Sequence, residues 1–296
     1  MKRMIQALAG ASIAVGISVL GLKYIAYVLT GSVALLSDAI ESIVNVATAI
    51  VALLAVRWSS MPPDAGHPYG HHKAEYLSAV AEGVLIVIAA LSILREAYFG
   101  YLAPKLLDAP WQGLAVNGAA SLINAVWSWV LIRQGRRERS PALVADGRHL
   151  LADVISSVGV VAGVALAALT GWAMLDPALA AAVALHILWS GWGLMKESVG
   201  ALMDEAVPPQ MLAHIREIIA TNSDGAIEVH DLRTRHAGRM MFIDFHLVVP
   251  SSMSVAAAHD ICDRIERAIK AESPDTLISV HVEPEDKTNH SGIVLM

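Results

Sequence analysis

Long apolar stretches fill the first two-thirds of the chain and alternate with short polar or turn-forming breaks. A helix needs about 20 apolar residues to cross the hydrocarbon core of a bilayer. Several stretches exceed that length, which indicates tilt or extension beyond the bilayer. Six stretches qualify, and they cover about residues 4–29, 31–57, 76–102, 112–133, 142–170 and 177–200. The pattern predicts an all-α membrane domain of six helices within residues 1–206.

The pattern changes after Pro208. Residues 209–222 and 254–271 have the period of amphipathic helices, whereas three other segments alternate like strands. These strands are expected at 227–236, 239–249 and 276–284, the first two joined by the turn at Ala237 and Gly238. An α-β-β-α-β order predicts a small α+β domain with its helices on one face of a sheet. We expect this domain at residues 207–285, followed by a flexible tail at 286–296.

Composition narrows the function. The chain of 296 residues is 55% hydrophobic and only 16% charged, against about 25% charged in soluble proteins. Its net charge of −6 argues against nucleic acid as a partner, because nucleic-acid binding needs a basic surface. The single cysteine, Cys262, excludes an internal disulfide and a thiolate zinc cage. Any bound metal must therefore be held by histidines and carboxylates.

Basic residues in the loops predict the orientation in the membrane. Lys2, Arg3, Arg57, Lys73 and the arginines of 133–139 fall on one side, and only Lys105 falls on the other. We therefore expect a multi-pass protein of the cell inner membrane with both termini in the cytoplasm. The first apolar stretch runs too long for a signal peptide and lacks a small-residue cleavage site, so we interpret it as a membrane helix.

Ionisable residues inside membrane spans are costly and need a functional or structural reason. The second span carries Glu41 and Asn45, and the fifth carries His149 and Asp153. Each pair is spaced i, i+4 and shares one helix face. The two spans run in opposite directions, so both pairs reach the middle of the bilayer. Together they would make a tetrahedral site for a divalent metal ion.

Hydrogen bonding between helices is the alternative interpretation of these groups, above all for Asn45. A polar stripe on the fourth span is better explained by helix packing alone, because its side chains cost little to bury. The stripe consists of Asn117, Ser121, Asn124 and Ser128.

The polar loop after the second span offers a second set of ligands, Asp64, His67 and His71, in a turn-rich segment. They could close on one metal ion and leave a position for water. The alternative is that these are surface histidines that bind nothing, since a flexible loop does not fix geometry.

Strand alternation in the C-terminal domain crowds histidines and carboxylates onto the open face of the sheet. Glu228 and His230 share a face of the first strand, and Asp244 and His246 share the polar face of the second strand. His281 and Glu283 follow on the third strand, and His259 lies on the second helix, one turn from Asp263. A solvated polar face is the alternative, but these donors favour a metal cluster.

Three segments resemble the cation diffusion facilitator family, and a fourth is close to its bacterial zinc/iron-efflux branch. They are residues 37–45 (SDAIESIVN), 67–75 (HPYGHHKAE), 149–153 (HLLAD) and 230–235 (HDLRTR). The resemblance implies a homodimeric metal/proton antiporter, not an enzyme. It also implies that each six-helix unit carries a ferredoxin-like, metallochaperone-like cytosolic domain at the dimer contact.

The resemblance also implies roles for particular residues. The transport site would be Glu41, Asn45, His149 and Asp153, and the loop site would be Asp64, His67 and His71. The cytosolic cluster would be His230, His246, His281 and Glu283, with His259 as a further candidate. Lys73 and Asp204 match a charge pair that ties the membrane region to the C-terminal domain.

The chain departs from the zinc branch at two positions. That branch usually has Asp or His where Glu41 stands and Asp where Asn45 stands. An amide cannot be deprotonated, so the site carries one negative charge fewer than it would with Asp. One histidine, two carboxylates and an amide lie between a zinc-type and an oxygen-rich site. Zn²⁺ is therefore the first expectation and Cd²⁺ a surrogate, while Fe²⁺ and Mn²⁺ stay open.

The sequence thus predicts a divalent-metal exporter that uses protons as the counter-ion and works in the lipid bilayer. A manganese or iron exporter is the alternative within the same class. A membrane-anchored metal sensor is the alternative from another class, but it gives no reason for a buried quartet of metal ligands.

Overall fold

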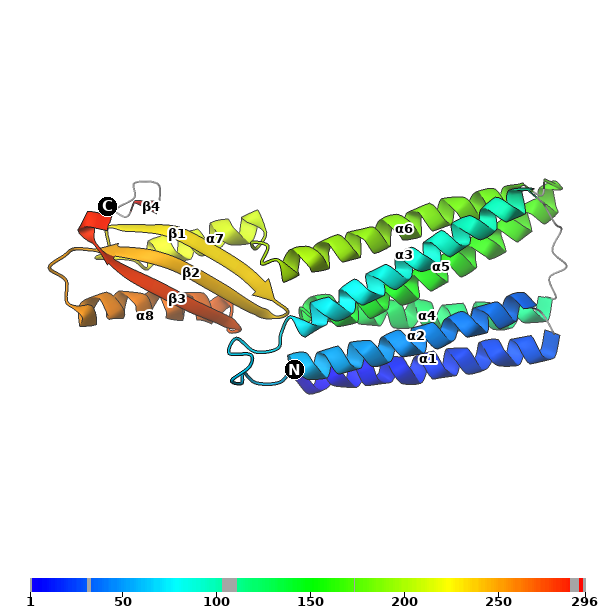
Figure 1. Ribbon diagram of the computed structural model, residues 1–296, viewed down its shortest axis with the longest axis horizontal. Helices are drawn as coiled ribbons and strands as arrows, with labels where there is room; N and C mark the ends of the chain where they lie inside the picture. The colour runs from blue at the N-terminus through cyan, green and yellow to red at the C-terminus, as the bar shows by residue number, and fades with distance from the viewer. Residues whose placement is uncertain (1, 31–32, 103–110, 173, 288–292, 295–296) are drawn as a thin grey trace. The chain divides into compact units, whose positions relative to one another are not determined.

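A computed structural model describes residues 2–30, 33–102, 111–172, 174–287 and 293–294 (Figure 1). The chain divides into two compact units, Met1–Val199 and Gly200–Met296. The first unit is helical and the second combines helices with a sheet. The predicted fold class is confirmed.

Six long helices build the first unit, and they follow the predicted apolar stretches, although residues 31–32 of the second stretch lie outside the described residues. The helices are α1 (Lys2–Thr30), α2 (Val33–Ser59), α3 (Ala74–Leu102), α4 (Trp111–Arg137), α5 (Pro141–Thr170) and α6 (Leu175–Leu202). Within the described residues, four segments are long and apolar enough to cross a membrane: Arg3–Ile25, Ser42–Ser59, Ala74–Leu102 and Pro177–Leu202. Helices α4 and α5 are not among these four segments of the described residues.

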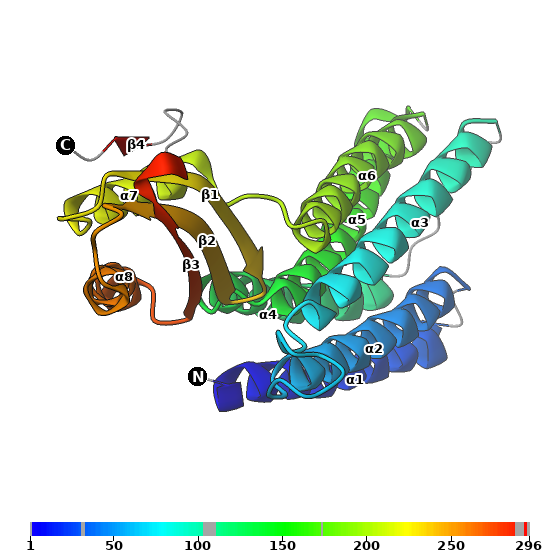
Figure 2. The ribbon, with the colours of Figure 1, turned by 60° about the vertical axis from the view of Figure 1, so that its left-hand side comes forward.

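Close helix contacts position the polar residues of this unit. Helix α1 packs along α2, and α4 packs along α5 (Figures 1 and 2). Gly147 lets α5 approach α4, since a Cβ there would lie 2.7 Å from Cγ1 of Ile132. Gly83 does the same for α3 and α6, where a Cβ would lie 2.6 Å from Cγ of Met195. Small residues at such contacts are how membrane helices gain packing energy.

A buried carboxylate, Glu75, joins the ends of three helices. It lies in the first turn of α3 and accepts a hydrogen bond of 2.7 Å from Ser59 Oγ at the end of α2. Its other oxygen accepts a hydrogen bond from Ser140 Oγ, immediately before α5. Its position at the end of the loop motif, residues 67–75, gave no indication of these contacts.

Replacing Glu75 with Ala is expected to lower the free energy of unfolding by about 2–4 kcal/mol, because two buried hydrogen bonds to a charged group are lost. Thermal unfolding of the detergent-solubilised protein, followed by size-exclusion chromatography, measures the effect. Glu96→Ala removes an exposed carboxylate from the same helix and is the matched control. Equal stability of the two variants would contradict this role for Glu75.

The second unit is a two-layer α+β domain. Its elements are α7 (Pro209–Thr221), β1 (Glu228–Ala237), β2 (Met240–Val249), α8 (Val255–Glu272) and β3 (Thr276–Pro284), in the predicted order. Strand β2 pairs antiparallel with β1 and parallel with β3. Apolar residues of α7, α8 and one face of the sheet share a single core, which includes Ile219, Phe245 and Ile265. The helices therefore cover one face and leave the other to polar side chains.

The segment 286–296 differs in part from the expected flexible tail. A 3-10 turn covers Glu285–Lys287, and the short strand β4 (Ile293–Val294) pairs antiparallel with β1. The sheet order is therefore β3-β2-β1-β4. A strand of two residues is too short to show an alternation of polar and apolar side chains, so the sequence did not predict β4. The edge of β1 offers its backbone as the hydrogen-bonding partner.

Candidate functional site

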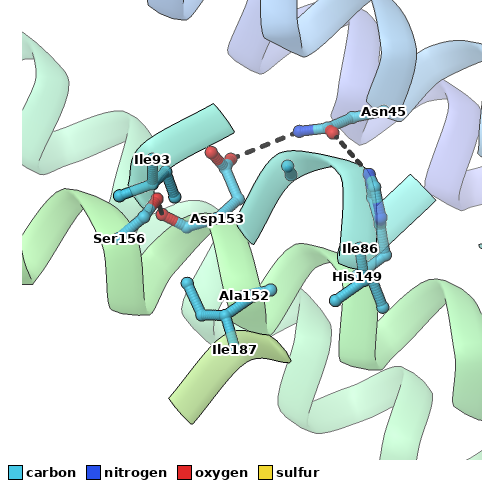
Figure 3. Close-up of a pocket in the computed structure, with 9 residues that line it drawn as sticks. Asn45, Ile86, Ile93, His149, Ala152, Asp153, Ser156 and Ile187 are labelled. Atoms are coloured by element: carbon cyan, nitrogen blue, oxygen red, sulfur yellow. Dashed lines mark hydrogen bonds between the residues drawn. The ribbon is translucent and has the colours of Figure 1, made fainter. Parts of the chain in front are cut away.

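Three of the four residues predicted for the transport site lie in direct contact. Asn45 of α2 bridges the two ligand candidates of α5 (Figure 3). Its Nδ2 donates to Oδ2 of Asp153 at 3.2 Å, and its Oδ1 lies 3.0 Å from Nε2 of His149. All three residues are buried. The i, i+4 spacing on α5 places His149 and Asp153 on one face, and α2 brings Asn45 between them.

The fourth predicted ligand, Glu41, belongs to α2, but its side chain lies outside the described residues. The i, i+4 spacing places its backbone one turn from Asn45 on the same face of the helix. Its membership of the site stays a prediction.

Two further residues contact Asp153, and the sequence analysis assigned neither to the site. Nδ2 of Asn124 on α4 donates to Oδ2 of Asp153 at 2.9 Å. Nζ of Lys23 on α1 lies 3.4 Å from the same oxygen, and the Lys23 side chain is 0% exposed. The sequence pattern predicts that Asn124 belongs to a packing stripe; its hydrogen bond does link α4 to α5, but it does so at Asp153 of the candidate site. The insertion cost of a charged residue in the first span was the signal that would have identified Lys23.

The rest of the stripe agrees better with packing. Ser128 Oγ donates to the backbone carbonyl of Gly147 on α5 at 2.8 Å. The side chain of Asn117 lies outside the described residues. A short hydroxyl that meets a neighbouring backbone is a normal way to satisfy polarity inside a helix bundle.

The site has lone pairs to offer a cation. Oδ1 of Asp153, Nδ1 of His149 and Oδ1 of Asn124 are buried and have no hydrogen-bond partner among the described residues. A small pocket lined by Asn45, His149 and Asp153 opens beside them, with Ile86 and Ile187 forming its apolar wall (Figure 3). Buried polar atoms are normally satisfied. Imidazole nitrogen together with carboxylate and amide oxygen suits a divalent transition-metal ion.

Two more buried carboxylates in this unit escaped the sequence analysis. Asp146 of α5 accepts a 2.6 Å hydrogen bond from Ser12 of α1, and Glu82 of α3 accepts a 3.1 Å hydrogen bond from Ser78. Both carboxylates are at most 1% exposed. The partner of Asp146 comes from a distant part of the sequence, so local spacing gave no indication of this contact.

The loop residues Asp64, His67 and His71 come together as predicted from their spacing. Asp64 Oδ1 lies 3.5 Å from Nδ1 of His67, and Oδ2 lies 3.4 Å from Nε2 of His71. The backbone N–H groups of His67 and Gly66 donate to Asp64, and these hydrogen bonds, aided by the two histidines, lower the pKa of its carboxyl. Asp64 therefore stays ionised and available to a cation.

A second group of ligand atoms forms on the polar face of the C-terminal sheet. Atoms of His230, His246 and Glu283 lie within 4.8 Å of one another. Glu283 reaches Nε2 of His230 at 3.2 Å and Nδ1 of His246 at 3.1 Å. The antiparallel register that places His230 opposite His246 accounts for this group, together with the parallel register of β2 and β3.

Two other predicted cluster residues are placed differently. His281 lies 3.7 Å from Glu283, but its side chain is 68% exposed. His259 pairs with Asp263 on α8 at 3.6 Å, and it does not belong to the compact ligand group found among the described residues. The family resemblance and the one-turn spacing to Asp263 suggest His259 as a ligand, whereas α8 packs on the opposite, apolar face of the sheet.

The predicted charge pair Lys73–Asp204 would join the two units of the chain and stays a prediction. Within the second unit, Asp204 lies 3.0 Å from Nη1 of Arg235. Arg235 in turn stacks over the ring of Phe242.

Comparison with known proteins identifies the family of both parts of the chain. The model of the cation efflux transmembrane domain matches residues 9–203, and that of the cation efflux protein cytoplasmic domain matches 207–285. A transporter of Synechocystis without assigned function is 44% identical over 273 residues, which cover 92% of this chain and 88% of that protein. The cation-efflux pump FieF of Escherichia fergusonii is 32% identical over 286 residues, covering 95% and 93%.

Solved structures match the C-terminal part. CzrB in its zinc form is 42% identical, with a TM-score of 0.28, over 29% of this chain and 98% of that one. The metal-bound C-terminal domain of the CzcD transporter from Thermotoga maritima is 23% identical, with a TM-score of 0.24, over 26% and 94%. The two domain models together cover nearly the whole chain, and the relatives align over almost their full length. The chain therefore belongs to the cation diffusion facilitator family of membrane cation efflux transporters.

Proposed function

We propose that this transporter exports a divalent transition-metal ion, zinc first and cadmium as a surrogate, in exchange for protons. The observation that carries the proposal is the buried contact between Asn45, His149 and Asp153, with lone pairs left unused on two of them. The imidazole suits zinc, whereas the carboxylate and amide oxygens also suit harder ions such as manganese, so zinc is the first expectation for this mixed site. Glu41 would complete the site, with iron or manganese as the alternative cargo.

Metal ions and protons compete for the same side chains of this site, and this competition couples the export of metal to the entry of protons. Histidine and carboxylate side chains must be deprotonated before they bind a metal ion, so metal binding releases protons. If two conformations expose the site alternately to the two sides of the membrane, incoming protons displace the metal on the far side. The site then returns protonated. Net export of metal then requires an inward proton gradient. In this proposal both termini lie in the cytoplasm and the protein lies in the inner membrane of the cell.

Metal-resolved flux tests the proposal. Purified protein is reconstituted into vesicles that carry a metal-sensitive or a pH-sensitive dye inside, and Zn²⁺, Cd²⁺, Fe²⁺ or Mn²⁺ is added outside. We expect zinc and cadmium to move and protons to move the other way. Preference for iron or manganese would correct the ion, whereas absence of any flux would refute the export function and favour a metal sensor.

We further propose that the protein is a homodimer and that the cluster His230, His246 and Glu283 regulates it. The cluster holds two imidazole nitrogens and a carboxylate within reach of one metal ion. Metal bound there would draw the C-terminal domains of the dimer together and favour a transport-competent arrangement. The cluster is then a sensor of cytosolic metal and not a step on the transport route. The loop site Asp64, His67 and His71 would bind metal with a similar ligand set.

Replacing His246 with Ala is expected to raise the metal concentration for half-maximal flux by about 10-fold, the size typical when a metal site loses supporting groups. The maximal rate should change little, because the transport site is intact. His259→Ala is the matched control, since His259 is exposed and lies outside the ligand group. Complete loss of flux in the His246 variant would contradict the regulatory role, and an equal shift in both variants would contradict the cluster.

A further inference from the structure

Lys23 is a fully buried cation inside the candidate transport site. Its ammonium lies 3.4 Å from Oδ2 of Asp153, and the exposed fractions of the two side chains are 0% and 5%. The amides of Asn45 and Asn124 donate to that same oxygen. All three donors thus meet at Oδ2, whereas the buried Oδ1 meets none among the described residues.

The positions along the helices show from which side Lys23 reaches the site. Ser12 of α1 and Asp146 of α5 are hydrogen bonded and therefore lie at one level. From that level, Lys23 lies about 16 Å further along α1 and Asp153 about 10 Å further along α5. Both helices run in the same direction, so the Lys23 backbone is about 6 Å beyond Asp153.

The Lys23 side chain bridges that difference. Side chains on a helix lean toward its N-terminus, so Lys23 leans back from its own level toward Asp153. The ammonium therefore enters from the side of the site that lies away from the N-termini of α1 and α5. In the orientation proposed above, this is the side on which the metal ion leaves.

We propose that Lys23 is a tethered counter-ion that competes with the transported metal for Asp153. The inference rests on the proposed export function. Without metal, the ammonium neutralises the buried carboxylate and keeps the empty site stable, since an unpaired buried charge is strongly unfavourable. An arriving divalent ion meets a positive charge on the same carboxylate, and the ammonium has to withdraw from Oδ2. Its return helps to expel the metal, so Lys23 sets the affinity of the site low enough for release.

A merely structural ion pair would have a different signature. It would lower stability when broken and leave the intrinsic metal affinity unchanged. A competing cation, by contrast, predicts that its removal tightens metal binding while it destabilises the metal-free protein. Lys23 is in this sense a positioning and affinity-setting residue, not a metal ligand.

The experiment measures equilibrium Zn²⁺ and Cd²⁺ binding to the full-length protein in detergent, in a His67→Ala, His246→Ala background that weakens the other two sites. Lys23→Met is expected to bind metal at least tenfold more tightly than the background, to unfold at a lower temperature without metal, and to gain more thermal stability on adding Zn²⁺. Flux measured in parallel should show a lower half-saturating concentration and a lower maximal rate, because release is slowed.

Three variants make the outcome decisive. Lys23→Arg keeps the charge and should restore the background affinity, and Ser18→Ala, which alters an exposed hydroxyl of α1 bonded to its own helix, should change nothing. If Lys23→Met does not fold, Lys23→Gln retains a hydrogen-bond donor without the charge and is expected to tighten binding likewise. Unchanged or weaker metal binding in a folded, uncharged variant would overturn the proposal.

The inference and the export function fail in different ways. A parent protein that moves no metal would refute export, whatever Lys23 does to binding. A parent that transports metal, with uncharged Lys23 variants of ordinary affinity, would refute the tethered counter-ion alone. Metal binding at the background affinity in Asp153→Asn would also overturn the tethered counter-ion, because Lys23 and the metal are proposed to compete for that carboxylate.

Discussion

Replacing Asp153 with Asn is expected to reduce metal-driven proton movement by more than about 100-fold, beyond the range for loss of a supporting group around a metal. Asp153 is the described carboxylate to which Asn45, Asn124 and Lys23 all bind. The amide has the same shape but removes the negative charge beside the buried Lys23 ammonium, so size-exclusion chromatography and thermal unfolding are used to confirm that the variant is folded. The amide carries no negative charge and takes no part in proton exchange, so both metal binding and coupling are lost. Vesicle flux with an internal pH-sensitive dye provides the measurement.

The control for this variant is Leu151→Ala, which truncates an exposed side chain two residues away on the same helix. It should transport at close to the parental rate. Flux that persists in Asp153→Asn at parental levels would show that the metal does not pass through this site. The assignment of His149 and Asn45 would then fall as well, because both contact the same centre.

Replacing Asn45 with Asp is expected to tighten zinc binding by about tenfold or more, since a further carboxylate beside a divalent ion adds attraction of several kcal/mol even at an effective dielectric constant of 20. Without metal, the same change turns a 3.2 Å hydrogen bond to Asp153 into a contact between two carboxylates. The metal-free protein should therefore lose about 1–3 kcal/mol of stability. Calorimetric titration and thermal unfolding with and without Zn²⁺ measure the two effects.

Asn45→Ser is the comparison for that variant. It removes the bridge to His149 and Asp153 without adding charge, and it is expected to weaken zinc binding. The two substitutions thus have opposite signs at one position. Equal affinity in both would show that Asn45 serves only as a link between α2 and α5.

The sequence predicted more of this fold than of its contacts. Six apolar stretches gave the six helices, because burial of a helix in lipid leaves a length signal that does not depend on tertiary structure. Alternation in the C-terminal part gave the strands and their open face, because each strand must turn one face to the helices. The two-residue strand β4 was too short for either signal.

The sequence predicted the part of the site that depends on spacing along single helices. His149 and Asp153 are one turn apart on α5, and the facing direction of α2 put Asn45 at their depth. Helix rotation is the part that sequence alone could not give. A helix that is apolar on almost every side offers little pattern to show which face turns inward.

The amino-acid sequence by itself predicted the six long helices and the α+β domain, and its i, i+4 spacing predicted that His149 and Asp153 share one face of α5. Only the tertiary structure decided that Lys23 and Asn124 share Asp153 with Asn45, that Asp146 meets Ser12, and that His259 stays apart from His230, His246 and Glu283. The physical reason is that these contacts join elements far apart in the chain, and their existence depends on how closely packed helices and strands are turned toward one another.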